Sequence, residues 1–249
     1  SNGGTVAAGN LTINASSISL AGNSILRTNG TSDTAFTSDV AIDGTSAGGQ
    51  TLSIDSGTSD LTISAAIGSS SNHPGTLSLG GEDITATANI SAAGITITTV
   101  EGSDGDSVDI SGITLDAEGG DLTINTDSLT TAGTATIQST GGTATLTLTG
   151  ESDSTIIDVG DSASGGTGLD ILESELQDVA STFSTIAIGY DTTQTGAITV
   201  NDTGGLTSLN SGLTLRSEGS GGVVNLSSAI DLTSTASTNL SVEGASINL

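Results

Sequence analysis

The chain has 249 residues, of which 28 are acidic and only two are basic, so its net charge is −26. Nucleic acids and anionic membranes are therefore poor candidate partners, because proteins bind both through clustered lysine and arginine. It has 36 glycines, three aromatic residues and no cysteine, methionine or tryptophan, so any core must consist of Ile, Leu, Val and Ala. Compact globular domains of this length normally bury many aromatic side chains, and most ordinary globular folds are therefore excluded as well.

A short apolar alternation recurs from one end of the chain to the other. Leu or Ile is followed by Ser or Thr and then by Ile or Leu again, and Gly, Asn, Asp or Ser comes next. Alternation of period two between turn-forming residues is typical of very short strands with one buried face. In chain order it predicts strands at residues 11–13, 18–20, 25–26, 52–54, 61–63, 77–79, 95–97, 108–110, 113–115, 122–124, 135–137, 146–148, 156–159, 186–188, 198–200, 213–215 and 230–232, and strands that begin at Ile84 and Ile90. Residues 31–50 show the pattern only weakly.

One segment, residues 171–190, departs from this alternation. Its apolar residues fall at helical spacing, namely Leu172, Leu176, Val179 and Phe183. Ser174 is a suitable N-cap residue, and Glu175 would lie in the first turn, where a negative charge is favourable. The sequence therefore predicts one short helix near residues 174–181.

The persistence of the strand pattern with almost no large side chains predicts an all-β fold, a β-solenoid with coils of roughly 20 residues. In such a stack each thin slice of aliphatic side chains is covered by the next coil. About 12 coils at a strand spacing of about 4.8 Å would give a rod of about 60 Å. No composition shift or proline-rich linker divides the chain, so we expect residues 1–249 to form a single continuous domain. The strand pattern runs almost to both ends, which predicts either a segment of a longer polypeptide or a subunit that stacks end to end.

Several stretches resemble a known kind of protein. Residues 9–20 (GNLTINASSISL) and 119–125 (GGDLTIN) are similar to repeats of bacterial filamentous-haemagglutinin-like surface proteins. Residues 172–177 (LESELQ), followed by 183–189 (FSTIAIG) and 196–200 (GAITV), resemble a unit that recurs in giant secreted proteins of that type. The resemblance implies a right-handed parallel β-helix, secretion to the bacterial cell surface, and a role as an adhesin or in an extracellular filament or coat. It carries over no catalytic residue.

Two acidic stretches could hold calcium, which prefers oxygen ligands. Asp104, Asp106 and Asp109, with Glu101 close by, lie on a Gly-Ser loop, where alternate residues of an extended segment share a side. Residues 165–173 fit the calcium-binding nonapeptide of β-rolls, which would use Asp170, although only one copy is present and β-rolls bind each ion between adjacent turns. The candidate calcium ligands are therefore Asp104, Asp106, Asp109 and Asp170. The alternatives are a solvated acidic turn and a Gly-rich turn before the helix.

Threonine-rich segments at residues 95–99 and 143–149 suggest an ice- or mineral-binding plane. Such a plane needs threonines aligned coil after coil, and the irregular strand spacing instead favours ordinary exposed strand residues.

His73 is the only histidine, so a histidine pair for metal binding or catalysis is excluded. Its place before Pro74 predicts an exposed turn.

These features disfavour an enzyme. A polysaccharide lyase needs basic residues at its site, but Arg27 and Arg216 lie far apart in the sequence, and a glycosidase would need aromatic platforms for sugar rings. We expect an extracellular structural or adhesive surface protein that forms a rigid acidic rod or filament. The alternatives are a carbohydrate-active β-helix and a calcium-binding surface-layer component of the β-roll type. The expected partners are further copies of the chain, associating end to end or laterally, and cell-surface polysaccharide. Since no stretch approaches 18 apolar residues, no membrane insertion is expected.

Overall fold

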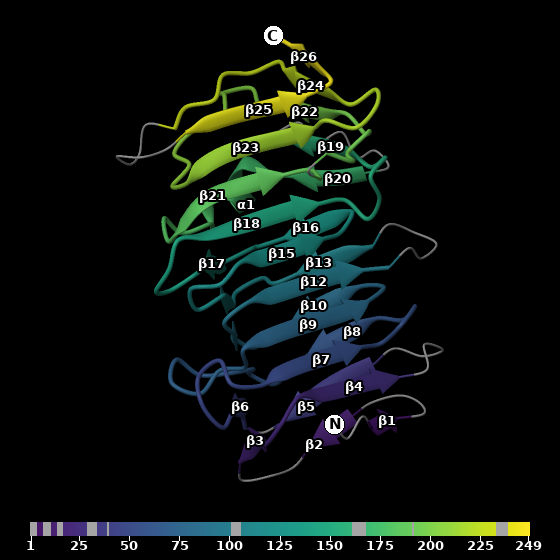
Figure 1. The fold of residues 1–249 in the computed structure, drawn as a ribbon, viewed down its shortest axis with the longest axis vertical. Helices are drawn as coiled ribbons and strands as arrows, with labels where there is room; N and C mark the ends of the chain where they lie inside the picture. The colour runs from purple at the N-terminus through teal and green to yellow at the C-terminus, as the bar shows by residue number, and fades with distance from the viewer. Residues whose placement is uncertain are drawn as a thin grey trace.

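The computed structural model describes residues 4–6, 11–13, 17–28, 34–38, 40–100, 106–160, 168–190, 192–232 and 239–249. In these ranges the strands pair in parallel and stack along the long axis of the molecule, with the N-terminal strands at one end and the C-terminal strands at the other (Figure 1). The predicted parallel β-solenoid is therefore confirmed. We expect the solenoid to wind in the right-handed sense, since nearly all parallel crossover connections have that hand.

Three sheets form the walls of the solenoid. In stacking order, sheet A consists of β1 (Gly4–Val6), β4 (Ser24–Thr28), β7 (Thr51–Asp55), β9 (Thr76–Gly81), β12 (Ile95–Thr99), β15 (Leu122–Asn125), β18 (Ala144–Thr149), β21 (Phe183–Ile188), β23 (Gly212–Ser217) and β25 (Leu240–Gly244). Sheet B consists of β2 (Leu11–Ile13), β5 (Thr34–Ser38), β8 (Leu61–Ile63), β10 (Ile84–Ala86), β13 (Ser107–Asp109), β16 (Ser128–Thr130), β20 (Gly168–Ile171), β19 (Ile156–Val159), β22 (Ile198–Val200), β24 (Val223–Leu226) and β26 (Ser246–Asn248). The third wall, sheet C, has two pieces, β3 (Ile18–Leu20) with β6 (Ile42–Gly44), and β11 (Ile90–Ser91) with β14 (Thr114–Asp116) and β17 (Thr136–Gln138).

The core is a set of aliphatic columns between these walls. In β15, Leu122 and Ile124 point inward and are buried, while Thr123 between them is partly exposed. Leu122 pairs in register with Ile95 on one side and with Leu146 on the other, so like side chains lie directly above one another. Each buried Leu or Ile contributes about 1.5–3 kcal/mol relative to an exposed one. Stacking therefore replaces the missing aromatic residues as the source of buried area.

The coils are longer and fewer than the sequence pattern suggests. Register partners in sheet A lie 18 residues apart from Leu77 to Ile95, 27 apart from Ile95 to Leu122, and 40 apart from Leu146 to Ile186. Ten strands in sheet A at about 4.8 Å give a stack of about 43 Å, rather than 60 Å. Variable corners absorb the differences in length, and small residues let them approach closely: a Cβ on Gly120 would lie only 1.7 Å from the carbonyl oxygen of Ala93.

The 40-residue coil holds the main irregularity of the fold. It contributes two strands to sheet B, with β20 lying between β16 and β19, so residues 168–171 of the candidate nonapeptide form a strand, while residues 165–167 lie outside the described residues. The helix α1 (Glu173–Gln177) follows β20 and is shorter than predicted. It ends early because Val179 forms a β-bridge with Ile137. Glu175, rather than Ser174, caps it, since its Oε2 accepts the Leu172 N–H at 2.9 Å.

His73 differs from the sequence expectation. Its side chain is buried, with 7% of its surface exposed, and Nδ1 lies 3.0 Å from the carbonyl oxygen of Pro74. The loop that carries it packs against the neighbouring coil, because the N–H of Gly48 donates to the His73 carbonyl oxygen. Among the described residues there is no helix of the length and apolarity needed to cross a membrane.

Candidate functional site

The predicted calcium ligands are not gathered at one place. Asp104 lies outside the described residues. Asp106 is buried before β13, whereas Asp109 lies on the outward face of that strand and accepts the Ser111 N–H at 2.9 Å. Asp170 lies on the outward face of β20, in register with Asp158 of β19. Within the described ranges, no group of three or more His, Asp or Glu side chains is arranged to hold a metal ion. Calcium binding at these residues stays a prediction.

Asp106 instead belongs to a carboxyl cluster at one corner of three successive coils, which consists of Asp106, Asp127 and Glu151. Asp106 precedes β13, Asp127 lies between β15 and β16, and Glu151 follows β18. The carboxyl groups of Glu151 and Asp106 share a hydrogen bond, and Thr99 Oγ1 donates to Glu151 Oε1. Burial, then the hydrogen bond to Asp106 and the negative charges of Asp106 and Asp127, raise the pKa of Glu151 to about 7. This corner can therefore hold a proton near neutral pH.

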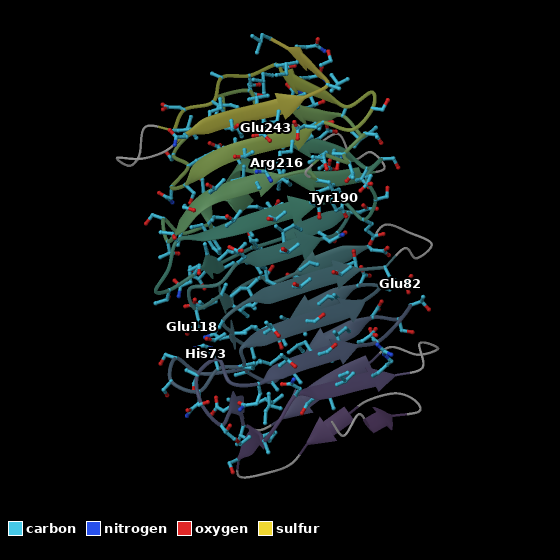
Figure 2. All side chains as sticks on the ribbon, viewed as in Figure 1. His73, Glu82, Glu118, Tyr190, Arg216 and Glu243 are labelled. Atoms are coloured by element: carbon cyan, nitrogen blue, oxygen red, sulfur yellow. The ribbon has the colours of Figure 1, made fainter. Side chains whose placement is uncertain are left out.

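Polar atoms beside this cluster lack hydrogen bonds. Glu151 Oε2, Thr149 Oγ1 and Asn125 Oδ1 are all buried without a partner. Tyr190 follows β21 at the same edge of sheet A (Figure 2), where its hydroxyl donates to the Gly150 carbonyl at 2.8 Å and accepts from Asn125 Nδ2 at 2.6 Å. Sequence reasoning pointed to Asp106 alone, because its partners lie on other coils.

A pocket of about 320 Å³ opens between α1 and the turn that joins β16 to β17. The helix supplies Ser174, Glu175 and Gln177, the end of β16 supplies Thr130, and the turn supplies Ala132. Glu175 is buried, with 5% of its surface exposed, and this burial raises the pKa of its carboxyl to about 7, with further contributions from the charges of Asp178 and Asp170. The pocket was not predicted, since it depends on how α1 packs beside residues 130–133, which come from a different coil.

A ladder of hydroxyl side chains runs up the outward face of sheet A. Five successive strands place a Ser or Thr at the same register position, namely Ser53, Ser78, Thr96, Thr123 and Thr147. All five are exposed or partly exposed. Irregular strand spacing favoured ordinary exposed strand residues over an aligned plane, yet these hydroxyl side chains are aligned, because the corners absorb the uneven lengths while the register is kept.

Both basic residues of the chain form ion pairs with an acidic residue on the next coil. Arg27 Nε lies 2.9 Å from Asp55 Oδ2, and Arg216 Nε lies 3.3 Å from Glu243 Oε2. Figure 2 shows Arg216 and Glu243 on the neighbouring strands β23 and β25. Since neither cation lies at the pocket or at the carboxyl cluster, these two places present oxygen atoms without positive charge.

Asp116 in sheet C differs from Glu151 and Glu175, because its pKa is lowered and theirs are raised. Burial by itself would raise its pKa, but hydrogen bonds from Thr140, from the Glu118 N–H and from Gln138 outweigh burial and lower it. Thr140 Oγ1 and Gln138 Nε2 each lie 2.6 Å from Asp116 Oδ2. This carboxylate is therefore a structural link between β14 and the next coil.

No family model matches the chain, and neither the curated proteins nor the solved structures gave a match.

Proposed function

We propose that this chain is an extracellular structural or adhesive surface protein, whose solenoid forms a rigid acidic body within a filament or coat. The observation that carries the proposal is the continuity of its parallel sheets: ten strands of sheet A and eleven of sheet B are joined by hydrogen bonds along the stacking axis. Such a body resists bending and presents long, regular outer faces. Its charge of −26 supports solubility and repels other copies of the chain, so association into a filament is expected to need salt or cations that screen this charge.

The same geometry supports a passive role over catalysis. Both arginines are engaged in ion pairs, so no free cation stands ready to hold an acidic sugar as a lyase requires. Phe183 is the one aromatic side chain in the described core, and its burial leaves it unable to serve as a sugar platform.

The location can be tested by treating intact cells of the source organism with a protease and identifying the released peptides by mass spectrometry. We expect peptides of this chain in the supernatant, from exposed corners such as residues 153–154, before a cytosolic marker is released. Detection of its peptides only after lysis would overturn the proposal.

The hydroxyl ladder of sheet A favours a second candidate function, adsorption to ice. The ladder repeats about every 4.8 Å across the strands and about every 6.6 Å along them, where Thr96 is followed by Thr98 on the same face. Threonine side chains have few rotamers, so their hydroxyls stay in fixed positions and can order a layer of water. The five ladder positions carry no charge.

This second candidate predicts that the purified protein slows the recrystallisation of ice. Thr96→Lys and Thr123→Lys should each raise the concentration needed by at least about tenfold, because a long charged side chain breaks the flat hydroxyl face. Thr85→Lys, on the outward face of sheet B, is the matched control and should have no effect. Equal activity of all three variants, or no activity of the unmodified protein, would exclude adsorption through sheet A.

A further inference from the structure

We infer that the pocket beside α1 binds a sugar unit that carries a free amino group. This inference names a ligand for the adhesive role proposed above and rests on that role for its biological meaning. Its physical basis is separate, because it depends on the pocket alone.

The pocket lies where the solenoid departs from its repeat. The coil from Leu146 to Ile186 is the longest in sheet A, and its extra length forms β20 and α1. In stacked-coil proteins, insertions of this kind gather on one face and often form the binding surface. At about 320 Å³ the pocket lies at the lower end of the range for small-molecule sites, which suits one or two sugar rings.

Its carboxyl groups are held in place before any ligand arrives. Thr131 Oγ1 donates to Asp178 Oδ2 at 2.6 Å, and the Leu172 N–H donates to Glu175 Oε2 at 2.9 Å. Side chains fixed in this way lose little conformational entropy when they bind a ligand. Two carboxyl groups therefore border the pocket in a preorganised arrangement.

These carboxyl groups lack a positive partner. Among the described residues, the charges that act on Glu175 are those of Asp178 and Asp170, both acidic, and residues 130–133, which also line the pocket, carry no charge. Burial raises the pKa of the Glu175 carboxyl, the negative charges of Asp178 and Asp170 raise it further, and no counter-ion offsets these effects. An ammonium group on a ligand would supply the missing charge, whereas an acidic sugar would be repelled.

The other lining groups fit the remainder of a sugar. Thr130, Ser174 and Gln177 are exposed polar side chains that can donate to and accept from ring hydroxyls. Leu172, with 39% of its surface exposed, offers an apolar contact for the C–H face of the ring. One such site binds weakly, and many copies in a filament would raise the overall affinity.

The test is ligand-observed NMR on the purified chain, with glucosamine, glucose, N-acetylglucosamine and glucuronic acid as probes. We expect saturation transfer to glucosamine with a dissociation constant on the order of 1–10 mM. Glucose and N-acetylglucosamine, which lack the charge, should bind at least about fivefold more weakly at low salt, and this difference should shrink as salt is added. Glucuronic acid should give no signal.

Two variants locate the site. Ala132→Trp places a large side chain at the pocket without changing the net charge and should abolish glucosamine binding. Ala21→Trp, the same substitution at an exposed position on a distant coil, should leave binding unchanged. Equal binding of glucosamine and glucose, unchanged binding in Ala132→Trp, or no binding by the unmodified chain would each overturn the inference. A chain that binds glucosamine but is found only inside cells would contradict the proposed function and leave this site intact.

Discussion

Replacing Leu146 by alanine is expected to lower the free energy of unfolding by about 3 kcal/mol. Leu146 is fully buried and stacks in register between Leu122 of β15 and Ile186 of β21. The hydrogen bonds of sheet A hold both neighbours at the strand spacing, so neither coil can move inward to fill the space. The cost should therefore include the cavity as well as the lost burial of the leucine side chain.

Thr147→Ala provides the matched control, because Thr147 is the next residue on the same strand and points outward. It should change the free energy of unfolding by less than about 0.5 kcal/mol. Urea unfolding followed by circular dichroism gives the two energies. Hydrogen exchange should show faster exchange in β15 and β21 than in the distant β7, since each coil contacts only its neighbours. Equal destabilisation by the two variants would contradict the inward and outward assignment of this strand.

The inward and outward faces could be predicted from the sequence, because alternation is a local property. Leu122 and Ile124 were expected on the buried side of a strand, and they are there. Coil length could not be predicted in the same way. All the corners use the same turn-forming residues, so the sequence does not indicate which strand begins a new coil or which strands are neighbours.

The candidate sites depend on which coils and strands are neighbours in the stack. Asp106 stood out because of its spacing from other acidic residues, but Asp127 and Glu151 become its neighbours only when three coils are stacked in register. The hydroxyl ladder likewise exists only because corners of unequal length still bring Thr96 opposite Thr123. His73 was expected in an exposed turn, and only the packing of its loop against the next coil buries it.

The stability of the protein should fall as the pH is raised from 5 to 8. The pKa values of Glu151 and Glu175 are both raised from 4.5 to about 7 in the folded state. Folding therefore favours their protonated forms. The stability gained in this way is fully present below about pH 4.5 and is lost as the pH rises through 7. Asp116 acts in the opposite sense, because its pKa is lowered from 3.8 in the folded state: its contribution is present above about pH 3.8 and is lost as the pH falls further, through the lowered pKa.

Glu175→Gln should flatten this pH dependence more clearly than any other single change. Glu175 is the more deeply buried of the two carboxyl groups, and its ionisation should cost on the order of 3 kcal/mol at pH 8. The amide oxygen of glutamine can still accept the Leu172 N–H, so the helix cap is kept. The variant should therefore melt at a higher temperature than the unmodified protein at pH 8 and at nearly the same temperature at pH 5.

Glu218→Gln separates this local effect from the general relief of repulsion in a chain of charge −26. It removes the same single charge from an exposed position. Because an exposed carboxylate is solvated in both the folded and the unfolded state, its removal should shift the melting temperature only slightly and by the same amount at both pH values. If Glu175→Gln and Glu218→Gln gave identical melting curves, long-range repulsion would account for the pH dependence, and the buried carboxyl of α1 would have no part in it.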